Sequence, residues 1–335
     1  MQGDQRIIIS RTDSIGDVVL TLPVAGMLKK QLPGCRVIFF GKSYTRDVIR
    51  ACEHIDEFLD WDEIYGSQDP ISLIGSLNAD IIIHVFPRRE IARIAKKAGI
   101  PVRMGTTNRL YHWGSCNKLV RLSRKRSDLH EAQLNLKLIK SLSGTGNVPL
   151  ESIYKLYGLS RVVAPDEEFD KLIEPGKFNL ILHPKSKGSA REWGLDNYTK
   201  LIDILPEEKF RIFVSGTTAE AEIMKESGIL KDPRVTDLCG KMTLSQLMSF
   251  IKRCDGLVAA STGPLHLAAA LGTKAIGIYP PIKPMHPGRW APLGEKANYL
   301  VQEKECNDCR KERSCQCMKE ITPETVKIML EEGVS

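Results

Sequence analysis

The sequence passes twice from a strand-like apolar run, through a short loop, into an apolar helical stretch. The first passage joins the run at 7–9 to the loop at 11–17, and the second joins 256–260 to the loop at 261–266. In open α/β sheets, ligands bind at the loops that follow the carboxyl ends of the strands. Two such passages, far apart in one chain, therefore predict two α/β domains whose binding loops face a central cleft.

Short apolar runs alternate with amphipathic stretches along both halves of the chain, which is typical of parallel sheets with crossover helices. A length of 335 residues also suits two domains of ordinary size. The predicted strands cover 6–10, 36–40, 57–61, 79–86 and 101–104, then 178–183, 210–215, 235–238, 256–260 and 275–279. The predicted helices cover 18–31, 44–51, 67–77, 88–98 and 129–141, then 196–205, 218–227, 244–253, 264–271 and 323–332. We expect doubly wound, Rossmann-like domains at 1–150 and 178–321, a linker region at 151–177, and a final helix at 322–335 that packs back on the first domain.

The composition is that of a globular protein, with 42% hydrophobic residues. The longest apolar runs, such as 81–86, are too short to span a bilayer. The first residues lack the basic-then-apolar layout of a signal peptide and run directly into a strand. These features predict a cytoplasmic protein.

The basic residues are concentrated in one segment. Residues 1–150 contain 22 Lys and Arg against 15 Asp and Glu, whereas the rest of the chain contains 26 of each. Within 88–126 there are 12 basic residues and one acid, Glu90. This local excess favours an anionic partner, namely a nucleic acid, an acidic membrane surface or a phosphorylated substrate. The alternative is a solvated basic face without a partner.

The second loop has the layout of a helix start that binds an anion. Thr262 is a capping-type residue, Gly263 follows it, and Pro264 stands where the first helical turn begins. Exposed amides and the helix dipole at such a start form a site for phosphate or diphosphate. His266, one turn further on, either contacts the phosphate or packs. The alternative for the whole loop is a well-capped helix without a ligand.

The first loop places Gly16 and Asp17 at a predicted helix start. Asp17 is either an N-cap or a general base, which requires a carboxylate beside an incoming hydroxyl. Asp13, four residues earlier, competes for both roles, and the spacing does not decide between the two residues.

Two further patterns concern metals. The four cysteines Cys306, Cys309, Cys315 and Cys317 include a Cys-x2-Cys pair, which is a common half of a structural zinc site. The cluster either holds a structural zinc or iron ion or consists of free or redox-labile thiols. Asp60 and Asp62 form a D-x-D sequence after a predicted strand, but such a short pattern is weak support for a catalytic metal.

The two loops resemble the signatures of glycosyltransferase family 9, the lipopolysaccharide heptosyltransferases, here at 11–23 and 261–272. Further segments that resemble the family follow in the family's order at 130–135, 183–185, 191–193 and 215–220, so that the resemblance spans about the whole chain. The resemblance implies the GT-B arrangement of two Rossmann-like domains. It also implies inverting transfer of heptose, without a metal, from ADP-heptose to an anionic inner-core acceptor.

The resemblance assigns roles to individual residues. Asp17 matches the proposed general base of the family, and Gly16 precedes it on the acceptor side. The residues matched to donor binding are Ser261, Thr262, Gly263, His266, Arg191, Lys185 and Glu220. Arg88, Arg89 and Arg109, in the basic segment, are expected to bind the phosphorylated acceptor. Peripheral contact with the cytoplasmic face of the inner membrane would follow from a lipid acceptor.

Several alternatives stay open. Ser261 stands where well-known heptosyltransferases often carry Asp, so that a different nucleotide sugar or a protein acceptor is an alternative. A nucleic-acid-binding protein would use the basic segment, but no helix-turn-helix, aromatic RNA-binding signature or zinc-finger spacing supports that class. An inactive sugar-nucleotide-binding module is a third alternative, which the presence of both Asp17 and the phosphate loop disfavours.

Overall fold

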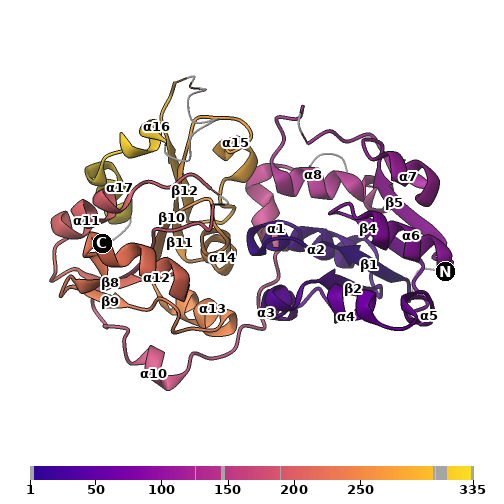
Figure 1. Ribbon diagram of the computed structural model, residues 1–335, viewed down its shortest axis with the longest axis horizontal. Helices are drawn as coiled ribbons and strands as arrows, with labels where there is room; N and C mark the ends of the chain where they lie inside the picture. Colours follow the sequence, from indigo (N-terminus) through magenta and orange to yellow (C-terminus); the bar gives the residue numbers. More distant parts are fainter. Residues whose placement is uncertain are drawn as a thin grey trace. The chain divides into compact units, whose positions relative to one another are not determined.

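The computed structural model describes residues 4–124, 126–144, 148–188, 190–304, 306 and 315–332 (Figure 1). The chain divides into two compact units, Met1–Arg161 and Val162–Ser335. The division falls inside the segment 151–177 that we predicted as a linker region. Residues up to Arg161 belong to the first unit because a 3-10 helix at Leu150–Leu156 packs on its helix α2 and Arg161 donates to the carbonyls of Glu53 and Ile55.

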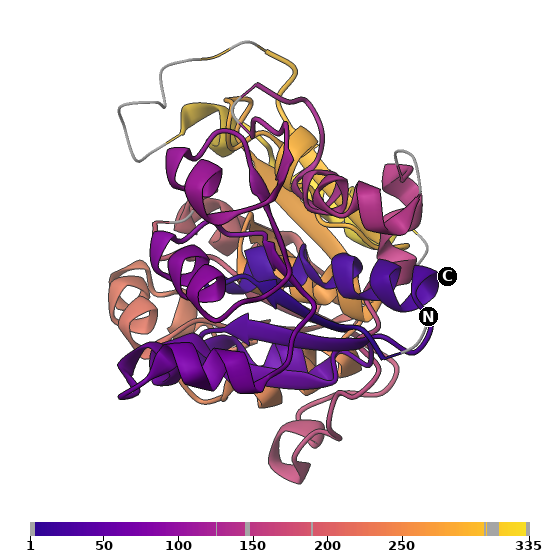
Figure 2. The same cartoon turned by 90° about the vertical axis from the view of Figure 1, so that its right-hand side faces the viewer.

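The N-terminal unit contains a six-stranded parallel sheet with the order β3-β2-β1-β4-β5-β6. Its strands are β1 (Arg6–Ser10), β2 (Arg36–Gly41), β3 (Glu57–Asp60), β4 (Ile81–His84), β5 (Val102–Thr106) and β6 (Lys118–Val120). Its α-helices are α1 (Ile15–Val19), α2 (Leu22–Gln31), α3 (Arg46–Ala51), α4 (Trp61–Gly66), α5 (Pro70–Ser76), α6 (Arg89–Lys97), α7 (Leu110–Ser115), α8 (Glu131–Leu138) and α9 (Lys140–Ser143). These elements, coloured indigo to magenta, face the viewer in Figure 2.

The apolar residues of this sheet explain its layered packing. Central strands such as β1 and β4 are buried along nearly their whole length, as expected for a parallel sheet covered on both faces. Isoleucines of β1, β2 and β4 form one core cluster with apolar residues of α4, α5 and α6. Helix α2 packs against α8 and α9 in a separate helical layer. Helix α6 buries one apolar face and leaves its basic face to solvent, whereas α2 is buried over its first seven residues.

The C-terminal unit repeats this architecture with the strand order β12-β11-β10-β7-β8-β9. Its strands are β7 (Phe178–His183), β8 (Phe210–Val214), β9 (Val235–Asp237), β10 (Gly256–Ala260), β11 (Lys274–Tyr279) and β12 (Ala297–Val301). Its α-helices are α10 (Glu167–Asp170), α11 (Leu195–Ile204), α12 (Thr218–Met224), α13 (Leu244–Arg253), α14 (Gly263–Leu271), α15 (Pro287–Trp290), α16 (Gln316–Lys319) and α17 (Pro323–Glu331). The prediction of two doubly wound α/β domains is confirmed.

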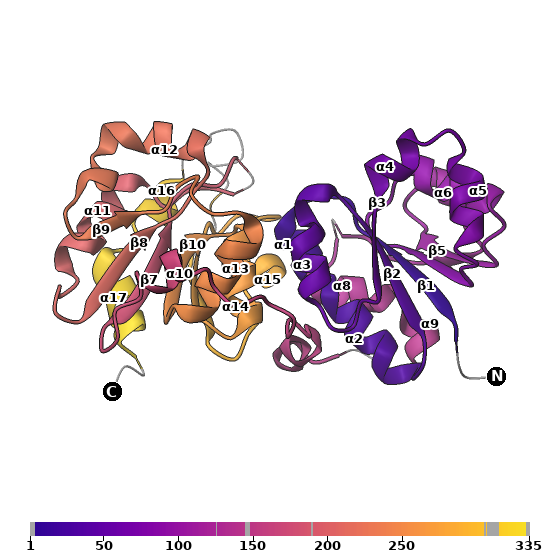
Figure 3. The same cartoon turned by 90° about the horizontal axis from the view of Figure 1, so that it is seen from below.

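The final helix α17 packs on the core of the C-terminal unit, and the expected contact of this helix with the first domain stays a prediction. It lies beside α11, and its Val326 and Leu330 belong to the same core cluster as Leu201 and Trp193 (Figures 1 and 3). The indole nitrogen of Trp193 also donates to the carbonyl of Ile321, 2.8 Å away, just before α17. The apolar face of the helix is thus used locally, which its amphipathic sequence alone could not reveal.

Candidate active site

Both predicted loops lie where the strand order of their sheet reverses. In the N-terminal unit the chain winds outward from β1 in one direction and from β4 in the other, and in the C-terminal unit from β7 and β10. β1 and β4 are adjacent, with Ser10 opposite His84, and β7 and β10 are adjacent, with His183 opposite Ala259. Such reversal points at the carboxyl ends of parallel strands are the places where open α/β sheets bind ligands.

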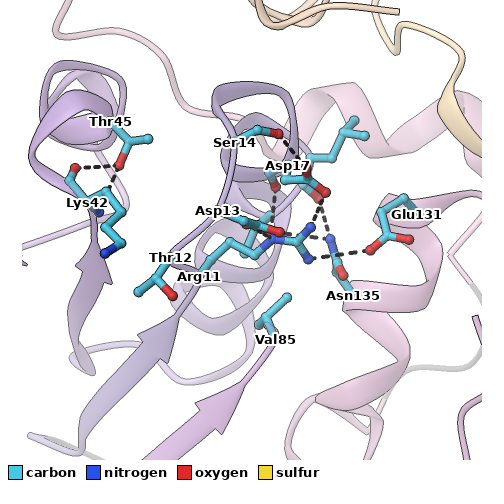
Figure 4. Close-up of polar contacts among 12 residues, drawn as sticks. Arg11, Thr12, Asp13, Ser14, Asp17, Lys42, Thr45, Val85, Glu131 and Asn135 are labelled. Atoms are coloured by element: carbon cyan, nitrogen blue, oxygen red, sulfur yellow. Dashed lines mark hydrogen bonds and ion pairs between the residues drawn. The ribbon is translucent and has the colours of Figure 1, made fainter. Parts of the chain in front are cut away.

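A buried arginine organises the N-terminal loop. Arg11, which is 3% exposed, follows β1 and points toward α1 and α8 (Figure 4). Its Nε lies 2.7 Å from Asp13, its Nη1 lies 3.4 Å from Glu131, and its Nη2 pairs with Asp17. Asp17 occupies the first turn of α1 and also accepts a hydrogen bond of 2.5 Å from the Ser14 hydroxyl. We call Arg11, Asp13, Asp17 and Glu131 the Arg11 cluster.

The Arg11 cluster carries more negative than positive charge. Arg124 adds a second guanidinium, whose Nε lies 2.8 Å from Glu131, so that three carboxylates face two arginines. Burial raises the pKa of Asp13 to about 6, although Arg11 opposes the shift and Asp17 adds to it. Burial by itself would lower the pKa of Arg11, but Asp17, Asp13 and Glu131 together raise it. Asp13 is therefore the carboxyl group of the cluster that takes up a proton in mildly acidic solution.

Helix α8 supplies a supporting layer that the sequence analysis did not assign. Glu131 and Asn135 lie one turn apart on α8, and both accept hydrogen bonds from Arg124. The Asn135 amide donates to the carbonyl of Leu20, 3.0 Å away, and so ties α8 to the end of α1. The sequence feature that could have predicted this layer is the pair of polar residues Glu131 and Asn135, which are four positions apart and so lie on one face of a helix. Both side chains are almost fully buried, and buried polar groups of this kind are expected to be paired.

The three arginines expected to bind the acceptor occupy different positions. Arg88 belongs to the loop after β4, and its guanidinium donates to the Thr12 hydroxyl (2.6 Å) and carbonyl (3.2 Å) while stacking on Phe86. Arg89 and Arg109 are exposed, on α6 and immediately before α7. In the part of the chain that the structure describes, neither Arg89 nor Arg109 forms a hydrogen bond or ion pair with the Arg11 cluster. The structure thus places Arg88 at the reversal point and the other two on the surface.

The C-terminal loop has a different chemistry. Thr262 is the N-cap of α14, Gly263 is its first residue, and Pro264 lies in its first turn. The Thr262 side chain makes no capping hydrogen bond, and its buried hydroxyl has no hydrogen-bond partner among the residues that the structure describes. The first amides of a helix also lack partners within the helix. This helix start therefore offers donors for an anion, and His266 lies buried one turn further on.

Two basic residues follow β7, the strand beside β10. Lys185 is paired with Glu192 at 2.5 Å, and Glu192 also accepts hydrogen bonds from the backbone amide and hydroxyl of Ser186. Arg191, next to Glu192, is partly buried and already interacts with another group of the protein. Because β7 and β10 are adjacent and parallel, these residues and Thr262 emerge at the same edge of the sheet. Glu192 was not among the predicted residues, although it stands between Arg191 and Trp193.

Glu220, expected at the nucleotide ribose, has a structural role in this structure. Its carboxylate accepts hydrogen bonds from the Thr217 amide (2.7 Å) and hydroxyl (3.0 Å), which forms a capping box at the start of α12. Nearby, the His183 ring is bonded to the Ser215 hydroxyl at 2.9 Å. Burial lowers the pKa of His183, against the opposing effect of Glu220. A contact of Glu220 with ribose remains a prediction.

The residues considered as metal ligands lie in two separate parts of the structure. Cys315 and Cys317 are buried in the apolar core of the C-terminal unit, Cys306 packs against it, and Cys309 lies outside the described residues. Within the described part of the chain, no group of three or more His, Cys, Asp or Glu residues is arranged to hold a metal ion. Asp60 caps α4 by accepting from the amide of Asp62, which itself pairs with Lys42. The metal hypothesis for the cysteines remains a prediction.

The sequence profile described as glycosyltransferase family 9 (heptosyltransferase) matches residues 73–319. A Haemophilus influenzae protein with a provisional glycosyltransferase name is 26% identical over 307 residues, which are 89% of this chain and 88% of that protein. Lipooligosaccharide heptosyltransferase 2 of Campylobacter jejuni is 31% identical over 165 residues, which are 46% of this chain and 50% of the relative. The solved structure of E. coli ADP-heptose LPS heptosyltransferase II matches with a TM-score of 0.76 and 18% identity, over 99% of this chain and 100% of that one.

The fold and the loops define a glycosyltransferase of the GT-B class, with two Rossmann-like units. The chain belongs to glycosyltransferase family 9. Within the described residues, none of the helices has the length and apolar character needed to cross a membrane.

Proposed function

We propose that this protein is an inverting, metal-independent heptosyltransferase, which moves heptose from ADP-heptose to an anionic acceptor of the lipopolysaccharide inner core. One observation carries the proposal: the reversal point of one unit presents carboxylates, and that of the other presents a helix start with an unbonded buried hydroxyl. The family match and the heptosyltransferase names of its relatives support the choice of sugar.

In the proposed reaction, Asp17 accepts the proton of the acceptor hydroxyl as its oxygen attacks the anomeric carbon. The new bond between oxygen and carbon forms while the bond from that carbon to the diphosphate breaks, on opposite faces of the sugar, and ADP leaves with the electron pair. Arg11 and the Ser14 hydroxyl hold the Asp17 carboxylate in place. The role of a positioned base is to remove the proton in the transition state.

The leaving diphosphate would bind at the start of α14. The Thr262 hydroxyl and the first amides of the helix supply donors, and Arg191 supplies a positive charge close to the same sheet edge. Lys185 contributes less, since it is already paired with Glu192. Fixed donors and cations of this kind stabilise a developing anion without a metal ion.

A second candidate function is transfer of a different sugar or transfer to a protein hydroxyl. Ser261 keeps this candidate open, because a serine at this position offers no carboxylate for sugar hydroxyls. Titration calorimetry with ADP, GDP, UDP and ADP-heptose, with and without EDTA, separates the candidates. Selective and EDTA-insensitive binding of ADP and ADP-heptose is expected, and preference for GDP or UDP would overturn the choice of heptose. NMR of the transfer product would then report inversion or retention at the anomeric carbon.

The cysteine segment and the membrane are further parts of the proposal. Four thiolates at Cys306, Cys309, Cys315 and Cys317 suit a structural zinc or iron ion, which would support the fold and take no part in transfer. Elemental analysis of the purified protein tests this role, and a metal-to-protein ratio close to zero in metal-supplemented preparations would refute it. A lipid acceptor would also bring the enzyme to the surface of the membrane as a peripheral protein.

A further inference from the structure

Helix α7 presents the most exposed large apolar side chains among the described residues. Leu110 is 89% exposed and Trp113 is 63% exposed. They are three positions apart, so that both lie on the same face of the helix. Single exposed apolar residues are common on protein surfaces, but the two largest exposures side by side on one short helix call for an explanation.

The opposite face of α7 is anchored in the protein. His112 and Ser115 are buried, and the His112 ring packs near that of His84 in the sheet. The indole nitrogen of Trp113 donates to the carbonyl of Thr107 at 3.0 Å. The exposed ring is therefore held with its polar edge satisfied while the rest faces solvent. An indole presented in this way is typical of side chains at the boundary between water and an apolar phase.

Exposed basic residues lie next to α7, on the adjacent helix α6 and in the flanking sequence. Helix α6 packs beside α7, and the Lys96 ammonium donates to the carbonyl of Gly114 at 2.7 Å (Figure 1). The exposed basic residues of α6 lie on one side of that helix at i, i+4, i+7 and i+8, namely Arg89, Arg93, Lys96 and Lys97. Exposed basic residues also flank α7 in sequence, at Arg109, Lys118 and Arg121.

Few acidic residues accompany these basic residues in the sequence. Glu90 is the single acid between Arg88 and Arg126. Among the described residues, the exposed arginines and lysines of α6 and those that flank α7 form no ion pairs. The net positive charge of the chain also falls entirely in its first 150 residues.

We propose that the outward face of α7, together with the basic side of α6, is a docking surface for an anionic lipid bilayer. Leu110 and Trp113 would enter the interfacial region while the lysines and arginines pair with lipid phosphates. A nucleic acid would account for the charge but not for an exposed leucine beside the tryptophan, so that the observations favour the bilayer. This docking surface rests on the proposed function, because an enzyme with a lipid acceptor works at the surface of a membrane. Binding to vesicles, however, can be measured without any turnover.

The test uses the full-length protein and vesicles of phosphatidylcholine with or without phosphatidylglycerol. Tryptophan fluorescence is a suitable reporter, because Trp61 and Trp193 are buried and Trp290 is half-buried, whereas Trp113 is exposed. We expect co-sedimentation with the anionic vesicles at low salt, with a blue shift of the emission. The Trp113→Phe variant should lose the blue shift while the protein still binds.

Two double variants separate the contributions. Leu110→Ser with Trp113→Ser should weaken vesicle binding at least tenfold, and Arg93→Gln with Lys97→Gln should weaken it roughly 25-fold, because each basic residue near an anionic surface contributes roughly a factor of five. The matched controls are Ile328→Ser, which removes a 61% exposed apolar side chain on α17, and Lys200→Gln with Lys252→Gln in the electrically neutral half. Both controls should bind like the unmodified protein.

A failure of membrane docking can be distinguished from a failure of the proposed transfer reaction. Turnover with an acceptor freed of its acyl chains should be unchanged in the Leu110 and Trp113 variants, so that lost docking is not confused with lost chemistry. Equal binding of the apolar double variant and the unmodified protein would overturn the docking surface, as would a missing blue shift. If the protein binds nucleic acid, and this binding depends on Arg93 and Lys97 but not on Leu110, the surface is a nucleic-acid site and the docking of a bilayer is refuted.

Discussion

The two reversal points occupy the same position in the same architecture, yet they carry opposite chemistry. At the N-terminal one, Arg11 is enclosed by the carboxylates of Asp13, Asp17 and Glu131. At the C-terminal one, the start of α14 offers backbone amides and the hydroxyl of Thr262, without an acid in its first turn. Three carboxylates repel a diphosphate, and a helix start attracts it. The fold thus supplies two similar edges, and the side chains determine which edge accepts a proton and which binds an anion.

The comparison also shows how each edge is held. The Arg11 cluster depends on a buried cation that is paired on several sides, so that the loss of one partner leaves uncompensated charge. The start of α14 depends on backbone geometry, with Pro264 in the first turn and Gly272 in the left-handed conformation after its end. Substitutions should therefore disturb the first edge through electrostatics and the second mainly through ligand contacts.

The largest effect is expected from Asp17→Asn. The amide keeps the size of the side chain but cannot accept the proton, so that kcat should fall roughly 10³-fold, within the range of a positioned base. Binding of ADP, measured by calorimetry, should stay within about threefold, because the donor is assigned to the other unit. The matched variant Asp13→Asn should lower kcat far less. If Asp13→Asn is the inactive variant and Asp17→Asn stays active, the assignment of the base is reversed.

The architecture could be predicted from the sequence, because the buried strands of parallel sheets appear as short apolar runs. The ranges 6–10, 178–183 and 256–260 match β1, β7 and β10 residue for residue, since the buried central strands consist mostly of apolar residues. The edge strands β6 and β12 were missed, because Lys118–Val120 is short and Ala297–Val301 is only partly buried. The predicted helix at 18–31 is two helices, α1 and α2, with the break at Leu20 and Thr21.

The loops themselves were predictable, but their partners were not. A glycine and an acid after a strand predicted Gly16 and Asp17, and Thr262 with Gly263 predicted the start of α14. The contact between Arg11 and Glu131 spans 120 positions in the sequence, and no local pattern encodes such a contact. The same holds for Arg88 and Thr12, 76 positions apart.

The second prediction tests the buried cation. Arg11→Met removes the partner of Asp13, Asp17 and Glu131 while keeping much of the side-chain volume, so that the free energy of unfolding should drop by about 3–5 kcal/mol. Urea denaturation followed by circular dichroism measures the loss. Arg11→Lys is the control, and it should recover part of the stability because the charge remains. A loss below about 1 kcal/mol for Arg11→Met would show that the cluster does not depend on this cation.

The third prediction concerns pH and follows from the raised pKa of Asp13. In the unfolded chain this carboxyl has a pKa close to 3.8, and in the folded protein its pKa is about 6. Between these values the folded state retains a proton that the unfolded state has lost, so that this group makes stability fall as pH rises from about 4 to 6 and adds no slope above that window. The decrease should be about 1–3 kcal/mol. Asp13→Asn should remove this slope, and an unchanged difference between pH 4.5 and pH 7 would contradict it.

The fourth prediction compares two cations at the C-terminal edge. Arg191→Ala should weaken binding of ADP about tenfold or more, because a charge assigned to the diphosphate is lost. Lys185→Ala should weaken it only a few-fold, because Lys185 is already paired with Glu192 at 2.5 Å. Calorimetry at two salt concentrations shows which of the two variants loses more affinity for ADP. The reverse order would mean that Lys185 leaves Glu192 when the nucleotide binds.

The smallest effect is expected from Thr262→Val, which replaces the hydroxyl by a methyl group of similar size. The Thr262 hydroxyl is buried without a hydrogen-bond partner in the structure, so that its removal should leave the free energy of unfolding unchanged or slightly higher. Binding of ADP should weaken roughly threefold to tenfold, the contribution of one ordinary hydrogen bond. Thr262→Ser keeps the hydroxyl and should keep the affinity. Loss of stability without loss of affinity would show that the hydroxyl serves the helix start and not the diphosphate, and the contrast between the two edges would then rest on the backbone amides alone.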